Sequence, residues 1–529
     1  MITQSFTSAV VASLLLIAST VSSRPPSLAA GVADAPHRLR AVVVVFDGLR
    51  PDYVTASRMP MLHAFARRGV TSSAHHSLFP TVTRVNASAL ATGAGPGQHG
   101  ILDNTIFLPR VDSARALNTG DGRVMAHADT VLGGTLLTIP SMPQLLSAAG
   151  RKVLVASAGS SGSAYLLAGA GRAPTLNAEY TTPAALQHMS QAVLGEAPED
   201  ASPNLGLNAR AVDGLLTIGI DSLDVDVAYL WLSDPDHTVH GAGIGSTIGD
   251  SSIRAADREF GRLLRGLQER NLTEQVDIFV VSDHGFSTHA GREAPITSVL
   301  MPFRDRVTVA GGAVYIRRGG DTTRAALVRA LQASPAVGSI FTRSPVSRPD
   351  TVAGVEPGTL SFGSIGWNHA RAGDVLFSAN WSHDVNAAGY RGRTEQAGTA
   401  GHGTTSPYDI TATLIAAGPH IRRASKTAVP TSNADIVPTI LHLLGMPVPG
   451  SLTGRVMHEV LRTGPASSAV PVTRDSVSAQ VPATVVRPGY RVTLYRSRVA
   501  TAMYVDSTVT TRPAQNRASA SGPGTTPRR

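Results

Sequence analysis

Six side chains that could bind metal ions occur in four short polar clusters, each at a point where the chain leaves a predicted strand. They are Asp47 in VVFDG, Asp236 and His240 in SDPDHTVHG, Asp283 and His284 in VVSDHG, and His402 in GHGTTSPYD. Three carboxylates and three imidazoles suit a pair of zinc ions that keep open positions for a substrate. Two ions about 3.5–4 Å apart can activate an attacking oxygen and stabilise a leaving oxygen together.

Each cluster also has a simpler interpretation. An aspartate at a strand end is most often a turn former or a helix cap, and the spacing D-x-x-x-H occurs by chance. Four neighbouring histidines are interpreted as surface or core residues: His75, His76, His237 and His289. The spacing alone leaves a two-metal hydrolase and a set of structural residues equally open. The occurrence of every cluster after a strand of one alternating pattern favours the hydrolase.

A threonine lies at the start of a predicted helix in the stretch SLFPTVTRVNASALATG. The residues leave two roles open for Thr83, which are a helix cap and a nucleophile. A threonine hydroxyl is a weak nucleophile until metal coordination lowers its pKa. The N-terminus of a helix also favours a phosphoryl group, because its dipole and free N–H groups attract anions. Thr81, two residues earlier, is interpreted as part of the turn.

Strand and helix patterns alternate along most of the chain. Continuous apolar runs in AVVVVF, KVLVASAG, VDVAYLWLSD and VDIFVVSDHG indicate buried parallel strands. Helical patterns occur in MPMLHAFARRG, SMPQLLSAAG and SSIRAADREFGRLLRGLQERN. This alternation predicts an α/β fold with a mostly parallel central sheet and helices on both faces. Ligands of such sheets bind at the carboxyl ends of the strands.

The chain of 529 residues divides into segments of different composition. We expect a catalytic core at 38–300 and 398–463 and an inserted α+β cap region at 301–397. A C-terminal extension with a β-hairpin is expected at 464–511, and a disordered tail at 512–529, where the sequence is rich in Ser, Pro and Arg.

The first 30 residues resemble an export signal. The apolar run AVVASLLLIAST is of signal-peptide length and is followed by small residues suited to cleavage. A retained membrane anchor is the alternative, although the run is too short to span a bilayer. No other stretch is long enough to be a transmembrane helix, so we expect an exported protein that is periplasmic or secreted.

Composition excludes several classes of function. The chain contains no cysteine, which rules out disulfides, zinc–thiolate sites and cysteine nucleophiles. The net charge of +9 includes one arginine of the predicted leader and four of the predicted tail, so the body carries about +4 without a dense basic run. We therefore expect no nucleic-acid-binding face.

Taken in order, the motifs resemble the alkaline phosphatase superfamily and, within it, the type I phosphodiesterase/nucleotide pyrophosphatase family. The resemblance covers roughly 41–287 and 400–459. The motifs that carry it are VVFDGLRPDY, FPTVT followed by ATGAGPGQHGILDN, DPDHTVHG, VVSDHG, and GHGTTSPYD with LIAAGP and NADIVPTILHLLG.

The resemblance implies roles for individual residues around a first zinc ion. Asp47, Asp283 and His284 would hold this ion, and Thr83 would be the nucleophile bound to it. Thr83 rather than Thr81 matches the family's nucleophile position. The last residue of HGILDN, Asn104, would bind a non-bridging oxygen of the phosphoryl group.

The second zinc ion would be held by Asp236, His240 and His402. The resemblance then implies an exported zinc-dependent hydrolase of phosphodiester or pyrophosphate bonds that acts through a phosphothreonine. Its partner would be a small-molecule phosphate ester or pyrophosphate. The sequence does not indicate an oligomeric state.

Two departures from the family pattern concern substrate specificity. Nucleotide pyrophosphatases commonly have an aromatic residue after the nucleophile, where it stacks on the base, but this chain has Arg84. Val85 and Asn86 replace the usual asparagine–histidine pair. Arg84 offers five donors that could bind a phosphate or carboxylate of the substrate, and it could equally point into solvent.

A choice between diesters and monoesters follows from a missing pair of cations. Related monoesterases place a lysine and an arginine near the terminal oxygens of a phosphate dianion, and the corresponding stretch VASAGSSGSAYLL has neither. This favours diesters or pyrophosphates. The alternatives are a phosphomonoesterase or phosphonate hydrolase of the same superfamily, and a non-catalytic metal-binding relative. Sulfatase activity is not expected, because the maturation motif is absent.

Overall fold

The computed structural model describes residues 37–291, 295–348, 351–484 and 488–513. The predicted signal at 1–30 and all but two residues of the predicted tail lie outside this range. All described residues belong to one structural unit that begins at His37. None of its helices is long and apolar enough to cross a membrane.

An eight-stranded sheet lies at the centre of the fold, with the strand order β21-β2-β20-β9-β1-β8-β6-β7. The five strands from β9 to β7 are parallel, and β20 pairs antiparallel with β9. Their bounds are β1 Ala41–Phe46, β2 Val70–Ser72, β6 Val153–Ser157, β7 Thr175–Asn177, β8 Val227–Leu232, β9 Asp277–Val281, β20 Leu414–Ala417 and β21 Ser425–Thr427. The four apolar runs that predicted strands all form strands of this sheet, and the expected mostly parallel α/β fold is confirmed.

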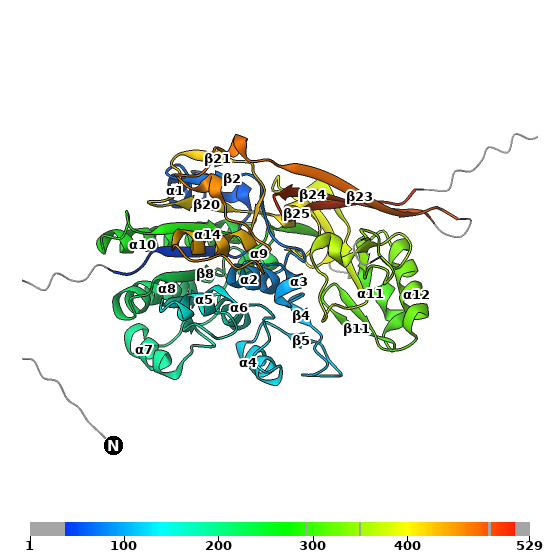
Figure 1. The fold of residues 1–529 in the computed structure, drawn as a ribbon, viewed down its shortest axis with the longest axis horizontal. Helices are drawn as coiled ribbons and strands as arrows, with labels where there is room; N and C mark the ends of the chain where they lie inside the picture. The colour runs from blue at the N-terminus through cyan, green and yellow to red at the C-terminus, as the bar shows by residue number, and fades with distance from the viewer. Residues whose placement is uncertain (1–36, 292–294, 349–350, 485–487, 514–529) are drawn as a thin grey trace, which may run out of the picture. The chain divides into compact units, whose positions relative to one another are not determined.

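Helices cover both faces of the sheet, and alternate residues of β1 show this directly. Val42, Val44 and Phe46 pack into one hydrophobic core, whereas Val43 and Val45 pack into the other. The first core includes residues of α1 Pro60–Ala66, α8 Leu205–Asp213 and α10 Thr247–Glu269. The second includes residues of α2 Thr83–Thr92, α5 Met142–Ala148, α6 Ser161–Leu167 and α14 Ile436–Leu443 (Figure 1). The sheet is therefore buried on both sides, as a parallel sheet requires.

The region expected to be a cap contains a second sheet with its own core. Five strands run in the order β11-β12-β15-β13-β14 beside α12 Gly320–Ala333. The strands are β11 Val307–Ala310, β12 Ala313–Ile316, β13 Val337–Thr342, β14 Leu360–Ser361 and β15 Val375–Ala379. Two further strands, β16 Trp381–Val385 and β17 Arg391–Ala397, join β10 Ser287–Gly291 and β18 Ala400–Gly401 in a four-stranded sheet. This four-stranded sheet connects the cap region to β10, which follows β9, and to β18, which precedes His402.

The C-terminal extension forms three antiparallel strands, whereas the sequence indicated only a hairpin. They are β23 Thr473–Val481, β24 Tyr490–Val499 and β25 Ala502–Thr511. β23 was not predicted because it is largely exposed and polar, so it lacks the apolar alternation of a half-buried strand. The hydroxyl of Tyr490 donates a hydrogen bond to the Gly338 carbonyl at 2.8 Å, and Trp381 Nε1 donates to the Thr508 carbonyl at 2.7 Å. These contacts fasten the extension to the cap region.

Shorter elements complete the described fold, and most of them lie in the loops around the sheet. The helices are α3 Pro96–His99, α4 Gly122–Val131, α7 Ala184–Leu194, α9 Asp236–Ala242, α11 Pro295–Leu300 and α13 Pro407–Ile410. The strands are β3 His75–His76, β4 Thr105–Ile106, β5 Leu117–Asn118, β19 Thr411–Ala412 and β22 Thr431–Ser432.

Candidate active site

The carboxyl ends of three neighbouring strands bring the predicted aspartates together. β1 lies between β8 and β9 in the sheet, and Asp47, Asp236 and Asp283 follow these three strands within a few residues. Backbone contacts lock the loops to one another. The Asp47 N–H donates to the Leu232 carbonyl and the Asp236 N–H donates to the Asp47 carbonyl, both at 3.0 Å. The Gly48 N–H donates to Asp283 Oδ1 at 3.1 Å.

The three predicted histidine ligands share one hydrogen-bond arrangement. Nδ1 of His240 lies 3.0 Å from the Ala400 carbonyl, Nδ1 of His284 lies 2.9 Å from the Gly285 carbonyl, and Nδ1 of His402 lies 2.8 Å from the Thr81 carbonyl. A carbonyl can only accept, so Nδ1 carries the proton in each ring. In a neutral imidazole this leaves the Nε2 lone pair free, which is the usual arrangement of a metal-bound histidine.

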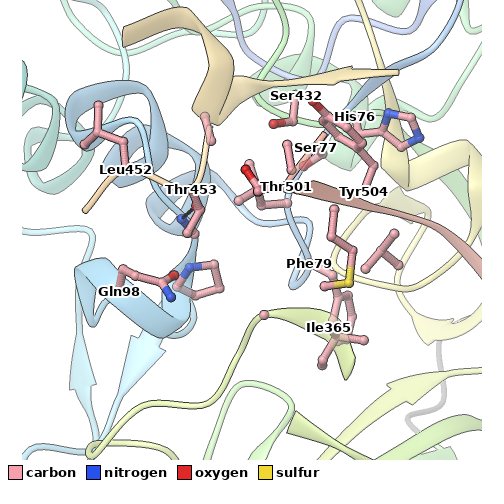
Figure 2. Close-up of a pocket in the computed structure, with 18 of the residues that line it drawn as sticks. His76, Ser77, Phe79, Gln98, Ile365, Ser432, Leu452, Thr453, Thr501 and Tyr504 are labelled. Carbon is pink, nitrogen blue, oxygen red and sulfur yellow. Dashed lines mark hydrogen bonds between the residues drawn. The ribbon is translucent and has the colours of Figure 1, made fainter. Parts of the chain in front are cut away.

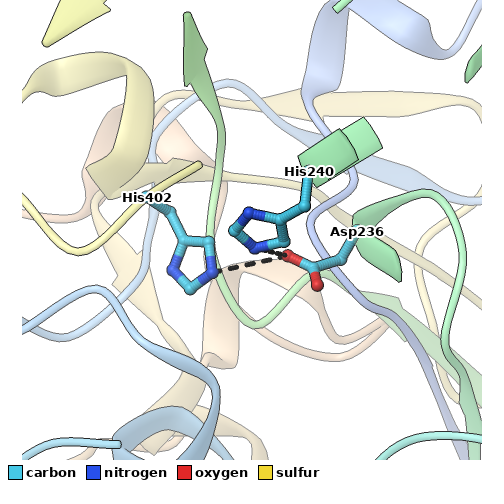
Figure 3. A group of neighbouring side chains, drawn as sticks. All are labelled: Asp236, His240 and His402. Carbon is cyan, nitrogen blue, oxygen red and sulfur yellow. Dashed lines mark ion pairs between the residues drawn. The ribbon is translucent and has the colours of Figure 1, made fainter. Parts of the chain in front are cut away.

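The free Nε2 atoms face carboxylate oxygens. Asp236 Oδ1 lies 3.2 Å from His240 Nε2 and 3.4 Å from His402 Nε2 (Figure 3). His284 Nε2 lies 3.2 Å from Asp283 Oδ2 and 3.5 Å from Asp47 Oδ1. These three carboxylate oxygens are buried and have no hydrogen-bond donor among the described residues.

Lone pairs that face one another in a buried site are stabilised by a proton or a cation between them. Two overlapping groups have donor atoms that all lie within 4.8 Å of one another, namely Asp236 with His240 and His402, and Asp236 with Asp47 and His284. The donor set of nitrogens and carboxylate oxygens suits divalent zinc. The first group is one of the predicted ligand sets. The second contains Asp236, where Asp283 was expected beside Asp47 and His284. Asp236 Oδ1 lies 3.9 Å from His284 Nε2, and Asp283 Oδ2 lies 3.2 Å from the same atom.

The electrostatics of the site also favour bound cations. Burial, and then the charges of Asp283 and Asp236, raises the pKa of Asp47 well above its usual range. Burial raises the pKa of Asp283 as well. Burial acts in the same sense on Asp236, but the charge and hydrogen bond that His240 supplies when it is protonated outweigh this effect, and the pKa of Asp236 is lowered. Divalent ions would hold all three carboxylates in their ionised form.

Burial, followed by the charge of His284, lowers the pKa of His402 well below its usual range. A neutral imidazole is the form that binds a metal ion. His402 is therefore suited to be a ligand at neutral pH.

Thr83 is the first residue of α2, and its side chain does not cap the helix. The N-cap position is Val82, and no side-chain hydrogen bond caps the helix N-terminus. Thr83 is only 5% exposed, and its Oγ1 lies 3.4 Å from His284 Nε2. The structure thus places the hydroxyl beside the candidate metal ligands and at a helix N-terminus, and the helix-cap interpretation is wrong.

Asn104 and Arg84 flank Thr83 on the same side of the site. Asn104 Oδ1 accepts a hydrogen bond from the Arg84 N–H at 3.0 Å, which fixes the amide next to the first turn of α2. Arg84 Nε is buried without a hydrogen-bond partner. Burial lowers the pKa of Arg84, and the charges of the site aspartates oppose this effect. The guanidinium is accommodated because residue 120 is a glycine, where an added Cβ would lie 2.7 Å from Arg84 Nη2.

A cavity of about 300 Å³ opens beside these residues and is lined by Asp47, Thr83, Arg84 and Asp236. Another cavity, of about 500 Å³, lies where the loop before α2, the cap region and the turn between β24 and β25 meet (Figure 2). It is lined by residues such as Ser77, Phe79 and Tyr504 and by none of the predicted site residues.

Comparison with known proteins agrees with this geometry. The model of the type I phosphodiesterase / nucleotide pyrophosphatase family matches residues 41–382, which is more than half of the chain. The chain belongs to this family. The match begins at the first residue of β1 and extends through the core into the cap region.

Curated relatives in this phosphodiesterase family match about half of the chain. Venom phosphodiesterase 2 of Crotalus adamanteus is 26% identical over 252 residues, which are 46% of this chain and 26% of the relative. Ectonucleotide pyrophosphatase/phosphodiesterase family member 3 of Mus musculus is 24% identical over 253 residues, which are 46% of this chain and 24% of the relative. The chain thus spans about a quarter of the length of these relatives.

Solved structures show the same fold over most of the chain. Murine ectonucleotide pyrophosphatase/phosphodiesterase 5 aligns with a TM-score of 0.56 and 18% identity, covering 80% of this chain and 100% of that structure. A mutant of the alkaline phosphatase PafA aligns with a TM-score of 0.61 and 16% identity, covering 81% and 100%. The alkaline-phosphatase-like fold expected from the motifs is confirmed.

Several supporting residues of this phosphodiesterase-family site were not found from the sequence. Trp231 Nε1 donates to Asp47 Oδ2 at 3.0 Å, which orients the carboxylate and leaves its Oδ1 without a hydrogen-bond donor among the described residues. Asp103 Oδ1 accepts from the Asn104 N–H at 2.7 Å, and its Oδ2 accepts from the Gly312 N–H at 3.1 Å. Asp103 therefore links the segment that carries Asn104 to the cap region, and burial raises its pKa to about 6.

Thr81 does more than complete a turn. It is fully buried, and its Oγ1 donates to the Thr404 carbonyl at 2.9 Å and accepts from the Gly403 N–H at 3.1 Å. Its own carbonyl accepts the Nδ1 proton of His402. Thr81 thus fixes the loop that carries His402, a role that the FPTVT motif did not reveal.

Asn86, which departs from the family pattern, also has a structural role. Its side-chain nitrogen donates to the Leu78 and Val82 carbonyls, and its oxygen accepts from the Leu78 N–H. The amide of Asn433 donates to Asn86 Oδ1 at 3.0 Å and to the Asp283 carbonyl at 2.9 Å. These contacts connect the turn before Thr83 to the loop after β9.

The other histidines near the motifs do not belong to either candidate metal group. Both ring nitrogens of His75 are occupied by Thr431 and Asn433. His76 contacts the Thr431 carbonyl and Asp506. Both are buried core residues, as one of the two interpretations of these histidines expected.

Proposed function

We propose that this chain is a metal-dependent phosphoric ester hydrolase in which Thr83 is the nucleophile. One observation carries the proposal. Buried carboxylate oxygens and imidazole lone pairs converge without hydrogen-bond donors beside a helix-terminal hydroxyl, Thr83 Oγ1, which lies 3.4 Å from His284 Nε2. The names of the curated relatives, which are phosphodiesterases and nucleotide pyrophosphatases, support the same reaction class.

We propose two zinc ions per chain, in the ligand sets implied by the family motifs. When bound, such ions polarise a phosphoryl group, lower the pKa of a coordinated hydroxyl and stabilise a leaving oxygen. Asp47, Asp283 and His284 would hold the ion beside Thr83. Asp236 Oδ1 lies within reach of all three imidazoles, so it would also help to fix the spacing between the two ions.

The residues of the chain then act in a simple order. Thr83 Oγ1 attacks phosphorus in line, a phosphothreonine forms, and one alcohol or phosphate leaves. Water then cleaves the phosphothreonine and regenerates the hydroxyl. The Arg84 N–H already donates to Asn104 Oδ1. The remaining N–H groups at the start of α2 and the side-chain NH2 group of Asn104 would bind the non-bridging oxygens, where charge develops.

We propose phosphodiesters or pyrophosphates as substrates in preference to phosphomonoesters. A monoester dianion needs additional cations beside phosphorus, and the residues between β6 and α6 that line the cavity are Ala158, Gly159 and Ser160. Among the described lining residues only Arg84 and His237 can carry positive charge. The unpartnered Arg84 Nε makes a phosphomonoesterase or phosphonate hydrolase the second candidate.

The test of the proposal compares two substrates on the zinc-loaded full chain. We expect kcat/KM for bis-p-nitrophenyl phosphate to exceed that for p-nitrophenyl phosphate by about tenfold or more, since one missing charge-assisted contact corresponds to about that factor. The reverse order would favour the monoesterase. If elemental analysis finds two zinc ions and neither compound is hydrolysed, the protein binds metal but lacks the proposed activity.

Arg84 is expected to contribute to substrate binding. Its guanidinium lines the cavity beside Thr83, and a buried unpartnered donor gains a partner when an anionic substrate enters. Arg84→Ala should lower kcat/KM for the preferred substrate by about 10- to 100-fold, as expected for a charge-assisted hydrogen bond of about 1.5–3 kcal/mol. Arg84→Lys should recover only part of this loss, because lysine lacks the planar fork.

The matched control for Arg84 is Arg115→Ala, which removes an exposed arginine outside the cavity. Steady-state kinetics over diester, monoester and phosphonate substrates make the comparison. Unchanged kinetics of Arg84→Ala on all of them would show that this residue does not contact the substrate.

We also propose that the protein is exported, to the periplasm or the medium. The proposal rests on the predicted signal at 1–30, which precedes the first described residue of the core. N-terminal sequencing of the mature protein checks it, and a chain that retains Met1 in the cytoplasmic fraction would contradict it.

A further inference from the structure

The cavity beside Thr83 is lined by two chemically different sets of residues. One set is Asp47, Thr83 and Asp236, which belong to the candidate metal and nucleophile site. The other set is not covered by the family motifs and includes Glu179, Asp200 and Asn204. A substrate whose phosphoryl group lies beside Thr83 would hold one of its ester groups in the same cavity, within reach of the second set.

Asn204 supplies a buried acceptor in the second set. The residue is only 1% exposed. Its Nδ2 donates to Asp200 Oδ1 at 2.9 Å, which fixes the orientation of the amide. Its Oδ1 is then left buried without a hydrogen-bond donor. A buried carbonyl oxygen in this state is costly unless a ligand supplies the missing donor.

Two exposed carboxylates of the second set add further acceptors. Glu179 Oε2 accepts from Ser161 Oγ at 2.8 Å, and Asp200 Oδ1 lies 3.5 Å from His237 Nε2. Both residues are exposed, and a carboxylate has room for about four donors. The second set therefore adds acceptors and negative charge to the cavity that Arg84 also lines.

The lining also lacks a surface on which a nucleobase could stack. None of the described residues that line this cavity is a phenylalanine, tyrosine or tryptophan. Recognition of a base usually depends on such stacking. A polar group that donates hydrogen bonds fits this lining better than a flat aromatic ring.

We propose that one ester group of the substrate is a small alcohol rich in hydrogen-bond donors, which binds Asn204, Glu179 and Asp200. The shared chemistry is that of an ethanolamine-like alcohol with a primary ammonium or of a glycerol-like polyol. This inference rests on the proposed hydrolase function, because it assumes that the phosphoryl group lies beside Thr83.

The experiment measures binding rather than turnover, so that it can fail independently of the proposed activity. The zinc-loaded Thr83→Ala chain is titrated calorimetrically with four phosphate monoesters that share the phosphoryl group. They are methyl phosphate, phosphoethanolamine, glycerol 3-phosphate and adenosine monophosphate. We expect at least one of the two donor-bearing compounds to bind about tenfold or more tightly than methyl phosphate.

Variants in the same background assign the effect to residues. The double variant Glu179→Gln/Asp200→Asn removes two negative charges. Its Kd for phosphoethanolamine should therefore be close to its Kd for methyl phosphate. Asn204→Leu should reduce the preference for both donor-bearing compounds. If Asn204→Leu does not fold, the carboxylate double variant still carries the test, because both of its positions are exposed. Glu196→Gln, an exposed position outside the cavity, is the matched control and should leave the ratios unchanged.

The pattern of Kd values separates the outcomes. A preference for phosphoethanolamine that the double variant abolishes identifies an ammonium group, and a preference for glycerol 3-phosphate that Asn204→Leu abolishes identifies a polyol. Equal affinity for the donor-bearing compounds and methyl phosphate overturns the inference, and so does tightest binding of adenosine monophosphate. If the wild-type chain shows no turnover but the binding preference is present, the proposed hydrolase activity is contradicted and the binding inference is not.

Discussion

Thr83→Ala should reduce turnover of the best diester by at least about a thousandfold, because the variant has no oxygen that can attack phosphorus. Its position at the start of α2, 5% exposed and 3.4 Å from His284 Nε2, is the basis for this expectation. Thr83→Ser keeps a hydroxyl and should retain a substantial part of the activity. The measurements are kcat and kcat/KM on the zinc-loaded protein, together with the metal content.

Two further observations make the Thr83 result specific. The change removes one hydroxyl and one methyl group, so the thermal midpoint and the number of bound zinc ions should stay close to those of the wild type. The matched control is Thr92→Ala, the same substitution at the other end of α2, where Oγ1 donates to the Ser88 carbonyl at 2.7 Å. Thr92 lies about 13 Å along the helix from Thr83, and its variant should remain active. If Thr83→Ala keeps more than a few per cent of wild-type kcat/KM, Thr83 is not the nucleophile.

The second large effect concerns the metal ligands. His402→Ala and Asp283→Ala should each lower the bound zinc from two ions to one per chain, because these residues belong to different predicted ligand sets. Each variant should also lose most of its turnover, since a paired site acts on both the attacking and the leaving oxygen. Elemental analysis gives the stoichiometry, and thermal unfolding gives a second readout that does not depend on activity.

The expected stabilisation by zinc follows from linkage. An ion present at 100 times its Kd stabilises the native state by about 2.7 kcal/mol, so zinc should raise the thermal midpoint of the wild type more than that of either variant. His420→Ala is the matched control, because His420 is exposed, pairs with Asp277 and lies outside both metal groups. An unchanged stoichiometry in both ligand variants would contradict the proposed two-ion site. A complete loss of metal in either variant would show that the two ions bind interdependently through Asp236.

Much of the catalytic core could be predicted from the sequence because its signals are local. A run such as AVVVVF is short and rich in β-branched residues, which indicates a strand buried on both faces, and a polar residue follows it in the turn. Since parallel strands end at the same edge, Asp47, Asp236 and Asp283 were expected to meet without knowledge of the strand order. The apolar periodicity of the segment at 251–271 likewise predicted a long helix, which the structure shows as α10 at Thr247–Glu269.

Other features are contacts between segments far apart in the chain, and no local pattern indicates them. Three hydrogen bonds join residues that are about 180 to 320 positions apart. They connect Trp231 with Asp47, Gly312 with Asp103, and His402 with Thr81. Each uses a side chain that would also suit a solvated turn. Only the assembled fold shows that these groups are buried and paired.

The sequence of this protein by itself determined the parallel sheet, the six candidate metal ligands and a threonine ahead of a helix. The tertiary structure decided that Thr83 is not a helix cap and that the Nε2 lone pairs of the histidines face unpartnered carboxylates. It also decided that Arg84 lies in the cavity rather than in solvent. The physical reason is that residue type and spacing decide which side chains follow the end of each strand. The burial, orientation and hydrogen-bond partners of these side chains depend on distant segments that pack around them.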